Sequence, residues 1–455
     1  MYRVRFLASL LALALLAPAA ALAVNTGTAD FTNYVSAGDS LTAGFMSGSL
    51  VDVSQRNSYP ALIAAQAGVA DFEQPLVSFP GIPNILTLQG LLPTVIVPAP
   101  GKGEPENLDL PRLYNNLAVP GETAGSMLTI KSDTQVPPHT PGLHDLILRG
   151  FGTQIEEVVG AKPTFVTLWI GNNDALGAAT SGNVALLTPI ATFQSEYQTI
   201  IGAIASTGAK MAIANIPNVT SIPFVTTIPP ILVDPTTNEP VIIGGNPVPL
   251  IGPHGPLAPD DHVLLSASAD LAKGLGIPVA AGGTGLPLPS SDVLTAADAA
   301  TIDARVQAFN QIIQTAASSV GAAFVDANAL LNQLATTGIE VGGIPFSAAF
   351  LTGGVFAYDG VHPTRYGYAF IANAFIAAIN TTFGADIPPA NLGNAIFDPE
   401  FAPGGPTSSL AAARGAVHET VWTRYLFTPA AMKNLASVLQ TTQKVPAPKP
   451  PRKRG

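Results

Sequence analysis

One run of residues limits the possible folds of this chain more than any other. Residues Pro163-Thr-Phe-Val-Thr-Leu-Trp-Ile170 are β-branched, aromatic or otherwise apolar almost without interruption. A half-exposed strand alternates apolar and polar side chains, whereas a continuous apolar run is typical of a parallel strand buried on both faces. The run ends in Gly171-Asn-Asn-Asp174, residue types that favour a turn. It therefore predicts a central strand of a parallel sheet.

Further strands and helices are expected to alternate along the chain. The expected strands are residues 34–37, 113–119, 163–170, 210–215 and 322–325, and the expected helices are residues 58–68, 190–206, 295–319 and 363–381. This alternation indicates a parallel sheet with helices on both faces, which is an α/β fold. Ligands of such sheets bind beyond the carboxyl ends of the strands, where we expect Ser40, Gly121 and Asn173 to lie.

Long segments interrupt this alternation. Residues 71–112 are rich in proline and glycine and fit a long loop or a short hairpin. Residues 218–293 combine many prolines and glycines with apolar runs, and so long an insertion in a compact domain is usually a functional lid or cap. For the apolar runs of both segments, the alternative is that they serve only in structural packing. Another apolar loop is expected between residues 322–325 and Tyr358.

The composition favours a soluble protein with an unusually apolar surface. Hydrophobic residues make up 47% of the 455 residues and charged residues only 11%, where about a quarter is usual for charged residues. No interior stretch reaches the roughly 18 uninterrupted apolar residues that a membrane span requires. The chain has no cysteine, which excludes disulfides, thiol catalysis and thiolate metal sites.

Both ends of the chain differ from its middle. A positively charged start, an apolar stretch over residues 6–16 and the small-residue site Ala21-Leu-Ala23 predict a secretory signal peptide over residues 1–23. The predicted destination is the periplasm or the exterior, and a retained N-terminal anchor is the alternative. Residues 398–442 have moderate helical character, and residues 443–455 are expected to form a disordered basic tail.

The charge of the chain bears on its partners. The formal net charge is −10, and the basic tail hides a body that is more acidic still. An acidic body argues against nucleic acid as a partner. The tail allows a transient contact with an anionic membrane surface, with a solubilising role as the alternative. The oligomeric state is left open.

A candidate nucleophile lies in Tyr34-Val-Ser-Ala-Gly-Asp-Ser-Leu-Thr-Ala-Gly44, where a predicted strand gives way to a helix. A serine at such a turn exposes its hydroxyl at the sheet edge and its N–H at a helix start. One turn can therefore supply both a nucleophile and a donor to the oxyanion that it creates. Asp39 is expected to brace this turn by hydrogen bonds.

A base and further oxyanion donors are available elsewhere. His362 follows Asp359 by three residues, so Asp359 can accept from Nδ1–H while Nε2 faces Ser40. In the alternative interpretation, Asp359 caps the helix near Pro363 and His362 is a surface residue. Gly121 N–H is expected at a helix start, with Glu122 in the first helical turn. Asn173 can add a side-chain amide, unless Asn172–Asp174 is only a turn and helix cap.

The remaining histidines receive structural interpretations. His139 and His144 are expected in a proline-rich loop, His254 and His262 in the large insertion, and His418 in the C-terminal helical segment. None has a metal-ligand partner at helical spacing, so no metal site and no cofactor are expected.

Four blocks of this sequence resemble, in order and in residues, those of the SGNH (GDSL-type) hydrolases. The blocks are Gly38-Asp-Ser-Leu41, Asn116-Leu-Ala-Val-Pro-Gly-Glu-Thr123, Gly171-Asn-Asn-Asp174 and Asp359-Gly-Val-His-Pro363. The resemblance implies a three-layer α/β/α, flavodoxin-like domain over residues 24–397 that hydrolyses esters through an acyl-enzyme. It also implies Ser40 as nucleophile, His362 as base and Asp359 as its orienter. The implied oxyanion hole consists of Ser40 N–H, Gly121 N–H and Asn173.

Three functions follow as hypotheses. The first is a secreted esterase or lipase that acts on a small-molecule or lipid ester. The second is a deacetylase of polysaccharide or cell-wall glycan esters, which is less favoured because the insertions are poor in aromatic and charged residues. The third is a non-catalytic surface binding protein, against which the intact triad positions argue.

Overall fold

The computed structural model describes residues 24–91, 94–234, 237 and 239–392. The predicted signal peptide at 1–23 and the predicted segments at 398–442 and 443–455 lie outside the described residues. Within the described ranges, no helix combines the length and the apolar character needed to cross a membrane.

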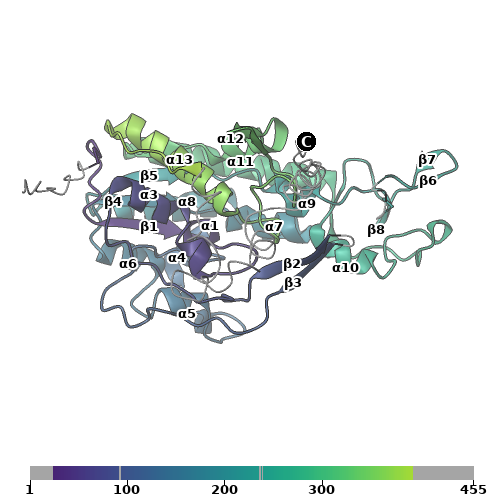
Figure 1. Cartoon of the computed structure of the whole chain (residues 1–455), viewed down its shortest axis with the longest axis horizontal. Coiled ribbons are helices and arrows are strands. Elements are labelled where there is room, and N and C mark those ends of the chain that lie inside the picture. Colours follow the sequence, from purple (N-terminus) through teal and green to yellow (C-terminus); the bar gives the residue numbers. More distant parts are fainter. Residues whose placement is uncertain (1–23, 92–93, 235–236, 238, 393–455) are drawn as a thin grey trace, which may run out of the picture.

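A parallel sheet forms the centre of the molecule (Figure 1). Its strands are β1 (Tyr34–Gly38), β4 (Phe165–Trp169), β5 (Lys210–Ala214) and β12 (Ala323–Val325), in the order β1-β4-β5-β12. Every neighbouring pair is parallel. All five residues of β4 are buried, as its continuous apolar run predicts. The expected α/β fold is confirmed.

The segment at 113–119 is only partly the strand that its sequence predicts. It runs along the free edge of β1, with one parallel bridge between Ser36 and Asn116. The backbone bonds are Ser36 N to Asn115 O (2.7 Å), Leu117 N to Ser36 O (2.9 Å) and Val119 N to Gly38 O (3.1 Å). Counting this edge segment, the spatial order is 2-1-3-4-5 in chain order, which is the flavodoxin-like arrangement.

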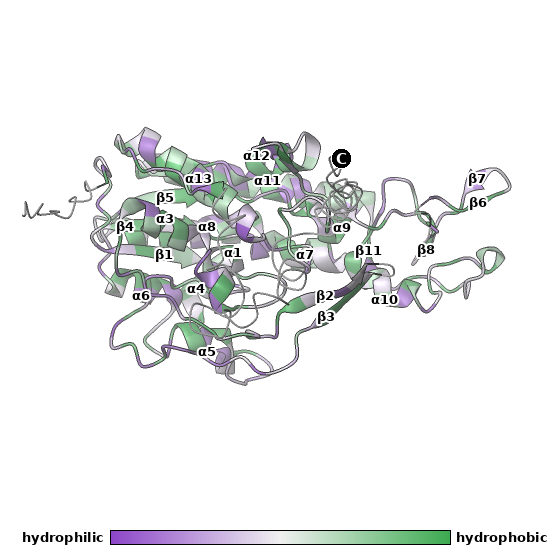
Figure 2. Ribbon diagram, in the orientation of Figure 1, coloured by the Kyte–Doolittle hydropathy of each residue, from purple (hydrophilic) through white to green (hydrophobic). Residues whose placement is uncertain are grey.

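Helices cover both faces of the sheet because successive strand side chains point to opposite sides. On one face, Tyr34, Phe165 and Trp169 pack against α3 (Tyr59–Ala67) and α13 (Arg365–Phe383). On the other, Val35, Val166 and other apolar strand residues share a core with several helices. These include α4 (Ala124–Thr129), α6 (Gln154–Gly160), α8 (Ile190–Ala205) and α11 (Ala296–Ser319). Figure 2 shows the central strands as predominantly apolar.

Helix ends follow the capping residues of the sequence. The side chain of Ser58 caps α3, which ends at Gly68 in the left-handed conformation, and Thr295 Oγ1 accepts from Asp298 N at the start of α11. The expected apolar loop before Tyr358 is wrong, because α12 (Ala327–Thr336) occupies its first part. Asp326 caps this helix by accepting from Ala329 N (2.9 Å), and buried leucines fix its inner face.

The first interrupting segment contains the short hairpin that was one of its two predicted forms, made of β2 (Leu86–Leu91) and β3 (Thr94–Pro98). Residues 218–293 contain short elements and an apolar cluster of their own, around Leu250, Val263 and Leu288. Part of this insertion projects from the body (Figure 1). Its helix α9 (Pro223–Thr226) is held on the main domain by a hydrogen bond from Phe224 N to Gly360 O (2.9 Å).

The other helices and strands are short. They are α1 (Ser40–Ala43), α2 (Asp52–Gln55), α5 (Leu143–Ile147), α7 (Asn173–Ser181), α10 (Ser268–Leu271), β6 (Ile242–Ile243), β7 (Asn246–Pro247), β8 (Ile251–Gly252), β9 (Gly255–Pro256), β10 (His262–Val263), β11 (Val293–Leu294), β13 (Ile339–Val341) and β14 (Ile344–Phe346).

Candidate active site

The turn between β1 and α1 presents Ser40 at the carboxyl end of the sheet. Gly38 has φ +150°, and a Cβ atom there would lie 2.1 Å from the carbonyl oxygen of Trp169, so only glycine fits. The buried amide of Gln154 accepts from Gly38 N and donates to Gly38 O, both at 2.9 Å. Ser40 is only 6% exposed. The turn is therefore fixed by the neighbouring strand and by α6.

Asp39 braces this turn, as its position predicted. Its Oδ1 accepts from Leu41 N (3.0 Å), and its Oδ2 accepts from Asn172 Nδ2 (2.7 Å). Burial raises the pKa of Asp39 to about 7, although the hydrogen bonds from Asn172 and Leu41 oppose this rise.

Ser40, His362 and Asp359 form a continuous hydrogen-bonded chain. Nε2 of His362 lies 2.9 Å from Ser40 Oγ, and Nδ1 lies 2.9 Å from Asp359 Oδ2. The alternative in which Asp359 caps the following helix is wrong, because α13 is capped by the side chain of Thr364. His362 is mostly buried rather than a surface residue.

The carboxylate of Asp359 is held from both sides. Oδ1 accepts from the backbone N–H groups of Val361 and His362 (both 2.9 Å), and Oδ2 accepts from Gly48 N (2.7 Å) as well as facing His362. Burial works to raise the pKa of Asp359. The charge of His362 and the hydrogen bonds outweigh burial and lower that pKa below its ordinary value. The group is therefore an anion suited to orienting an imidazole and stabilising its protonated form.

Gly121 lies in a tight turn before α4. Glu122 N donates to Val119 O (3.1 Å), Pro120 is the second residue of the turn, and Gly121 has φ +89°. This is the pattern of a type II turn, whose third residue needs positive φ. Among the described residues, neither Gly121 N–H nor Ser40 N–H has a hydrogen-bond partner.

The expectation that Glu122 lies in the first turn of a helix is wrong. Thr123 is the N-cap of α4 and accepts from Ser126 N (3.0 Å), so Gly121 and Glu122 precede the helix. The Glu122 carboxylate instead turns into the protein, where Oε2 lies 3.1 Å from His144 Nε2.

Asn173 is the first residue of α7, at the end of β4. Its Nδ2 donates to Glu122 O (2.9 Å), which uses one of the two amide hydrogens and leaves the other available. Asp174 joins α7 to α4, because its Oδ2 accepts from Ala124 N (3.0 Å). Burial raises the pKa of Asp174 to about 6, against the hydrogen bonds from Ala124 and Thr188.

Several supporting residues are not identifiable from the sequence pattern. Gln154 and Asn172 hold the turn that carries Ser40, and only Asn172 has a signal in the sequence, its place beside Asn173. His144 was expected in a loop with no role. It lies in α5, between Asp133 Oδ1 (2.8 Å) and Glu122 Oε2. His139, by contrast, is an exposed loop residue.

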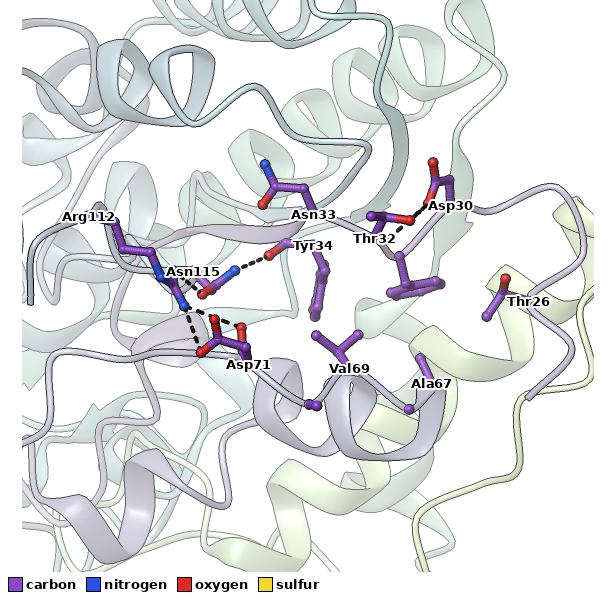
Figure 3. Close-up of a pocket in the computed structure, with 13 residues that line it drawn as sticks. Thr26, Asp30, Thr32, Asn33, Tyr34, Ala67, Val69, Asp71, Arg112 and Asn115 are labelled. Carbon is purple, nitrogen blue, oxygen red and sulfur yellow. Dashed lines mark hydrogen bonds and ion pairs between the residues drawn. The ribbon is translucent and has the colours of Figure 1, made fainter. Parts of the chain in front are cut away.

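Two cavities differ in their relation to these residues. One, of about 70 Å³, has apolar walls that include Leu41, next to Ser40, and Val361 and Pro363, which flank His362. Its other lining residues are Trp169, Pro217, Ile222, Ala327, Leu330, Leu331, Leu334, Val355, Phe356, Gly367 and Ile371. The second, of about 590 Å³, lies at the amino end of β1, away from the carboxyl end that carries Ser40, beside the Arg112–Asp71 ion pair (Figure 3).

Solved structures similar to this chain include three hydrolases. A lipase/acylhydrolase from Enterococcus faecalis is 13% identical (TM-score 0.32; 78% of this chain and 98% of that chain covered). An extracellular lipase from Streptomyces rimosus is 17% identical (0.33; 77% and 98%). A catalytic mutant of an acetylxylan esterase from Geobacillus stearothermophilus is 12% identical (0.34; 76% and 93%).

The family of the chain is assigned from a match to a sequence model. No curated protein matches the chain. The sequence model of the family described as GDSL-like lipase/acylhydrolase matches residues 34–375, a range that contains all four blocks on which the SGNH resemblance rests. That resemblance is confirmed, and this chain belongs to the GDSL-like lipase/acylhydrolase family.

Proposed function

We propose that this protein is a serine hydrolase that cleaves carboxylic esters through an acyl-enzyme, with Ser40 as nucleophile, His362 as base and Asp359 as its orienter. The observation that carries the proposal is the chain of two 2.9 Å contacts from Ser40 Oγ through His362 to Asp359. Serine needs such a base to become nucleophilic, and the base needs a third group to fix its tautomer.

The reaction has two half-steps. Nε2 of His362 takes the Ser40 proton while Oγ bonds to the ester carbonyl carbon. The tetrahedral intermediate then collapses, the bond to the alkoxy oxygen breaks, and Nε2 returns the proton to the leaving alcohol. Water repeats the sequence on the acyl-enzyme and releases the acid, which restores Ser40. Asp359 stays ionised throughout and stabilises the imidazolium form of His362.

The oxyanion is assigned to three donors: Ser40 N–H, Gly121 N–H and the free amide hydrogen of Asn173. Both backbone groups lack other partners within the described residues. The Asn173 amide is already oriented by Glu122 O. Donors fixed before charge develops stabilise the transition state without reorganisation.

The substrate is assigned to esters with an apolar acyl group. The support is the 70 Å³ apolar cavity, which is lined by Leu41, Val361 and Pro363, the sequence neighbours of Ser40 and His362. Each buried methylene is worth about 0.8 kcal/mol, or roughly fourfold in kcat/KM, so the rate rises with chain length until the cavity is full. The charged and apolar pattern of residues 1–23 supports a protein that acts after export.

Hydrolysis of p-nitrophenyl esters of increasing chain length, with Ser40→Ala as control, tests the mechanism. We expect Ser40→Ala to lower kcat by several orders of magnitude; a variant with the parent rate would exclude the mechanism. Release of acetate from acetylated glycan, without cleavage of longer esters, would move the substrate to the glycan class.

A cavity-filling pair tests the acyl site. Ala327 lines the cavity, and Ala329 lies exposed on the same helix. We expect Ala327→Leu to keep acetyl-ester hydrolysis and abolish the gain with longer chains, and Ala329→Leu to leave the profile unchanged. If both variants show the same dependence of rate on acyl chain length, the cavity does not bind the acyl group.

A further inference from the structure

A second histidine lies between two carboxylates, away from Ser40. Nδ1 of His144 is 2.8 Å from Asp133 Oδ1, and Nε2 is 3.1 Å from Glu122 Oε2. The His144 side chain is 12% exposed and that of Glu122 is fully buried. The two acids face opposite ring nitrogens, so the three groups do not converge on one metal ion.

The buried Glu122 carboxylate has the His144 ring as its close partner. Within the described residues, neither oxygen of Glu122 has a well-aligned hydrogen-bond donor, and the ring of His144 provides its close ion-pair contact. Burial works to lower the pKa of His144. The contact with Glu122, followed by that with Asp133, outweighs burial and raises that pKa. A buried carboxylate without a cationic partner is strongly destabilising.

Glu122 also joins two of the proposed oxyanion donors through its backbone. Its N–H closes the turn that presents Gly121 N–H, and its carbonyl oxygen accepts from Asn173 Nδ2. Any shift of Glu122 therefore moves both donors. Misplacement of a catalytic group by about 1 Å costs on the order of 100-fold in rate.

We propose that His144 is a positioning residue for the oxyanion hole: held by Asp133, it compensates the buried charge of Glu122 and so fixes Gly121 N–H and the Asn173 amide. This role rests on the function proposed above, because it acts on the same site. Without the His144 ring, the Glu122 carboxylate is buried without its close partner, which favours a shift of the turn that carries it toward solvent.

Three variants and one control test this role. His144→Gln leaves Glu122 charged and uncompensated, and we expect kcat to fall by about 10- to 100-fold while KM stays within about twofold, because oxyanion contacts act in the transition state. Glu122→Gln combined with His144→Gln removes the charge, and we expect kcat within about threefold of the parent value. Glu122→Gln alone is expected to have a similarly small effect. The control is His139→Gln, an exposed loop histidine, which we expect to match the parent.

The rate of Ser40 labelling by a fluorophosphonate and the thermal unfolding midpoint complete the test. An unchanged kcat in folded His144→Gln, a loss confined to KM, or no recovery in the folded double variant overturns the role of His144. If His144→Gln does not fold, the double variant must fold and be labelled within about threefold of the parent rate. Unfolding of both would show that the imidazole acts only in packing. No labelling of the parent, or full activity of Ser40→Ala, instead overturns the proposed function itself.

Discussion

The side-chain amide of Asn172 donates to Oδ2 of Asp39 at 2.7 Å, and this contact links the residues after β4 to the turn after β1. This hydrogen bond is buried. The other carboxyl oxygen of Asp39, Oδ1, accepts a hydrogen bond from the backbone N–H of Leu41. Asp39 thus connects Ser40 to the segment that carries Asn173.

The pH dependence of stability reports on this carboxyl group. Burial raises the pKa of Asp39 to about 7 from an ordinary value of 3.8. The folded protein therefore holds this proton more tightly than the unfolded chain, so the stabilisation is complete below about pH 4 and is lost as the pH rises through about 7. We expect Asp39→Asn, which cannot ionise, to flatten this decline.

Denaturant unfolding from pH 4 to pH 8 measures the effect. Asp39→Asn should be less stable than the parent at low pH, by about 1 kcal/mol for a weakened hydrogen bond. The difference should close and then reverse toward pH 8, because the parent loses the stabilisation that comes from the raised pKa of Asp39, about 1.4 kcal/mol for each pKa unit. Asp174 titrates in an overlapping window in both proteins, so only the difference between the two curves isolates Asp39. A constant deficit would show that Asp39 is ionised in the folded state over the whole range.

Substitution of Gly121 tests the geometry of the turn. A Cβ atom there meets nothing within 4 Å, but φ is +89°. Gly121→Ala therefore costs about 1–2 kcal/mol of backbone strain, and relief of that strain rotates the N–H that we assign to the oxyanion. We expect kcat to fall by about 10- to 100-fold. Gly208→Ala is the matched control, because Gly208 has φ +81° and equally open surroundings, and we expect it to lose stability but not kcat.

Asn173→Ala removes the proposed side-chain donor. Loss of one oxyanion donor costs about 10²–10³ in kcat, and we expect KM to change little, since the contact strengthens only in the transition state. Asn332→Ala, at an exposed position of α12, should leave both constants unchanged. Steady-state kinetics on one ester compare the three proteins; equal kcat values for Asn173→Ala and the parent would remove Asn173 from the oxyanion hole.

Much of the fold and of the site is predictable because local patterns specify it. The apolar run of β4, the caps Ser58 and Thr295, and the spacing of His362 from Asp359 are all properties of neighbouring residues. The contact made by Gln154 is one that local patterns do not predict. Its amide bonds the backbone of Gly38, 116 positions away, and nothing in its own segment indicates that partner.

The misassignment of Glu122 has the same cause. Glu122 fits a helix start by sequence, but the helix begins two residues later, and its carboxylate is drawn instead toward His144. The missed helix at residues 327–336 is a different case, because its cap Asp326 and its content of alanine and leucine favour a helix by sequence alone.

Asp359→Asn tests whether residue 359 orients His362, because the surrounding backbone N–H groups fix the direction in which the new asparagine amide points. The two backbone N–H groups at Oδ1 keep the amide oxygen on that side, so Nδ2 must face both Gly48 N–H and His362 Nδ1. A donor opposite Nδ1 favours the tautomer with the proton on Nε2, which cannot accept the Ser40 proton.

We expect Asp359→Asn to lower kcat by about 10³–10⁴. We also expect it to lower the free energy of unfolding by about 1–3 kcal/mol, because Gly48 N–H loses its acceptor. Asp326→Asn, an equivalent change at the cap of α12, should keep kcat within about twofold of the parent. If both variants have the same kcat, Asp359 does not orient the base.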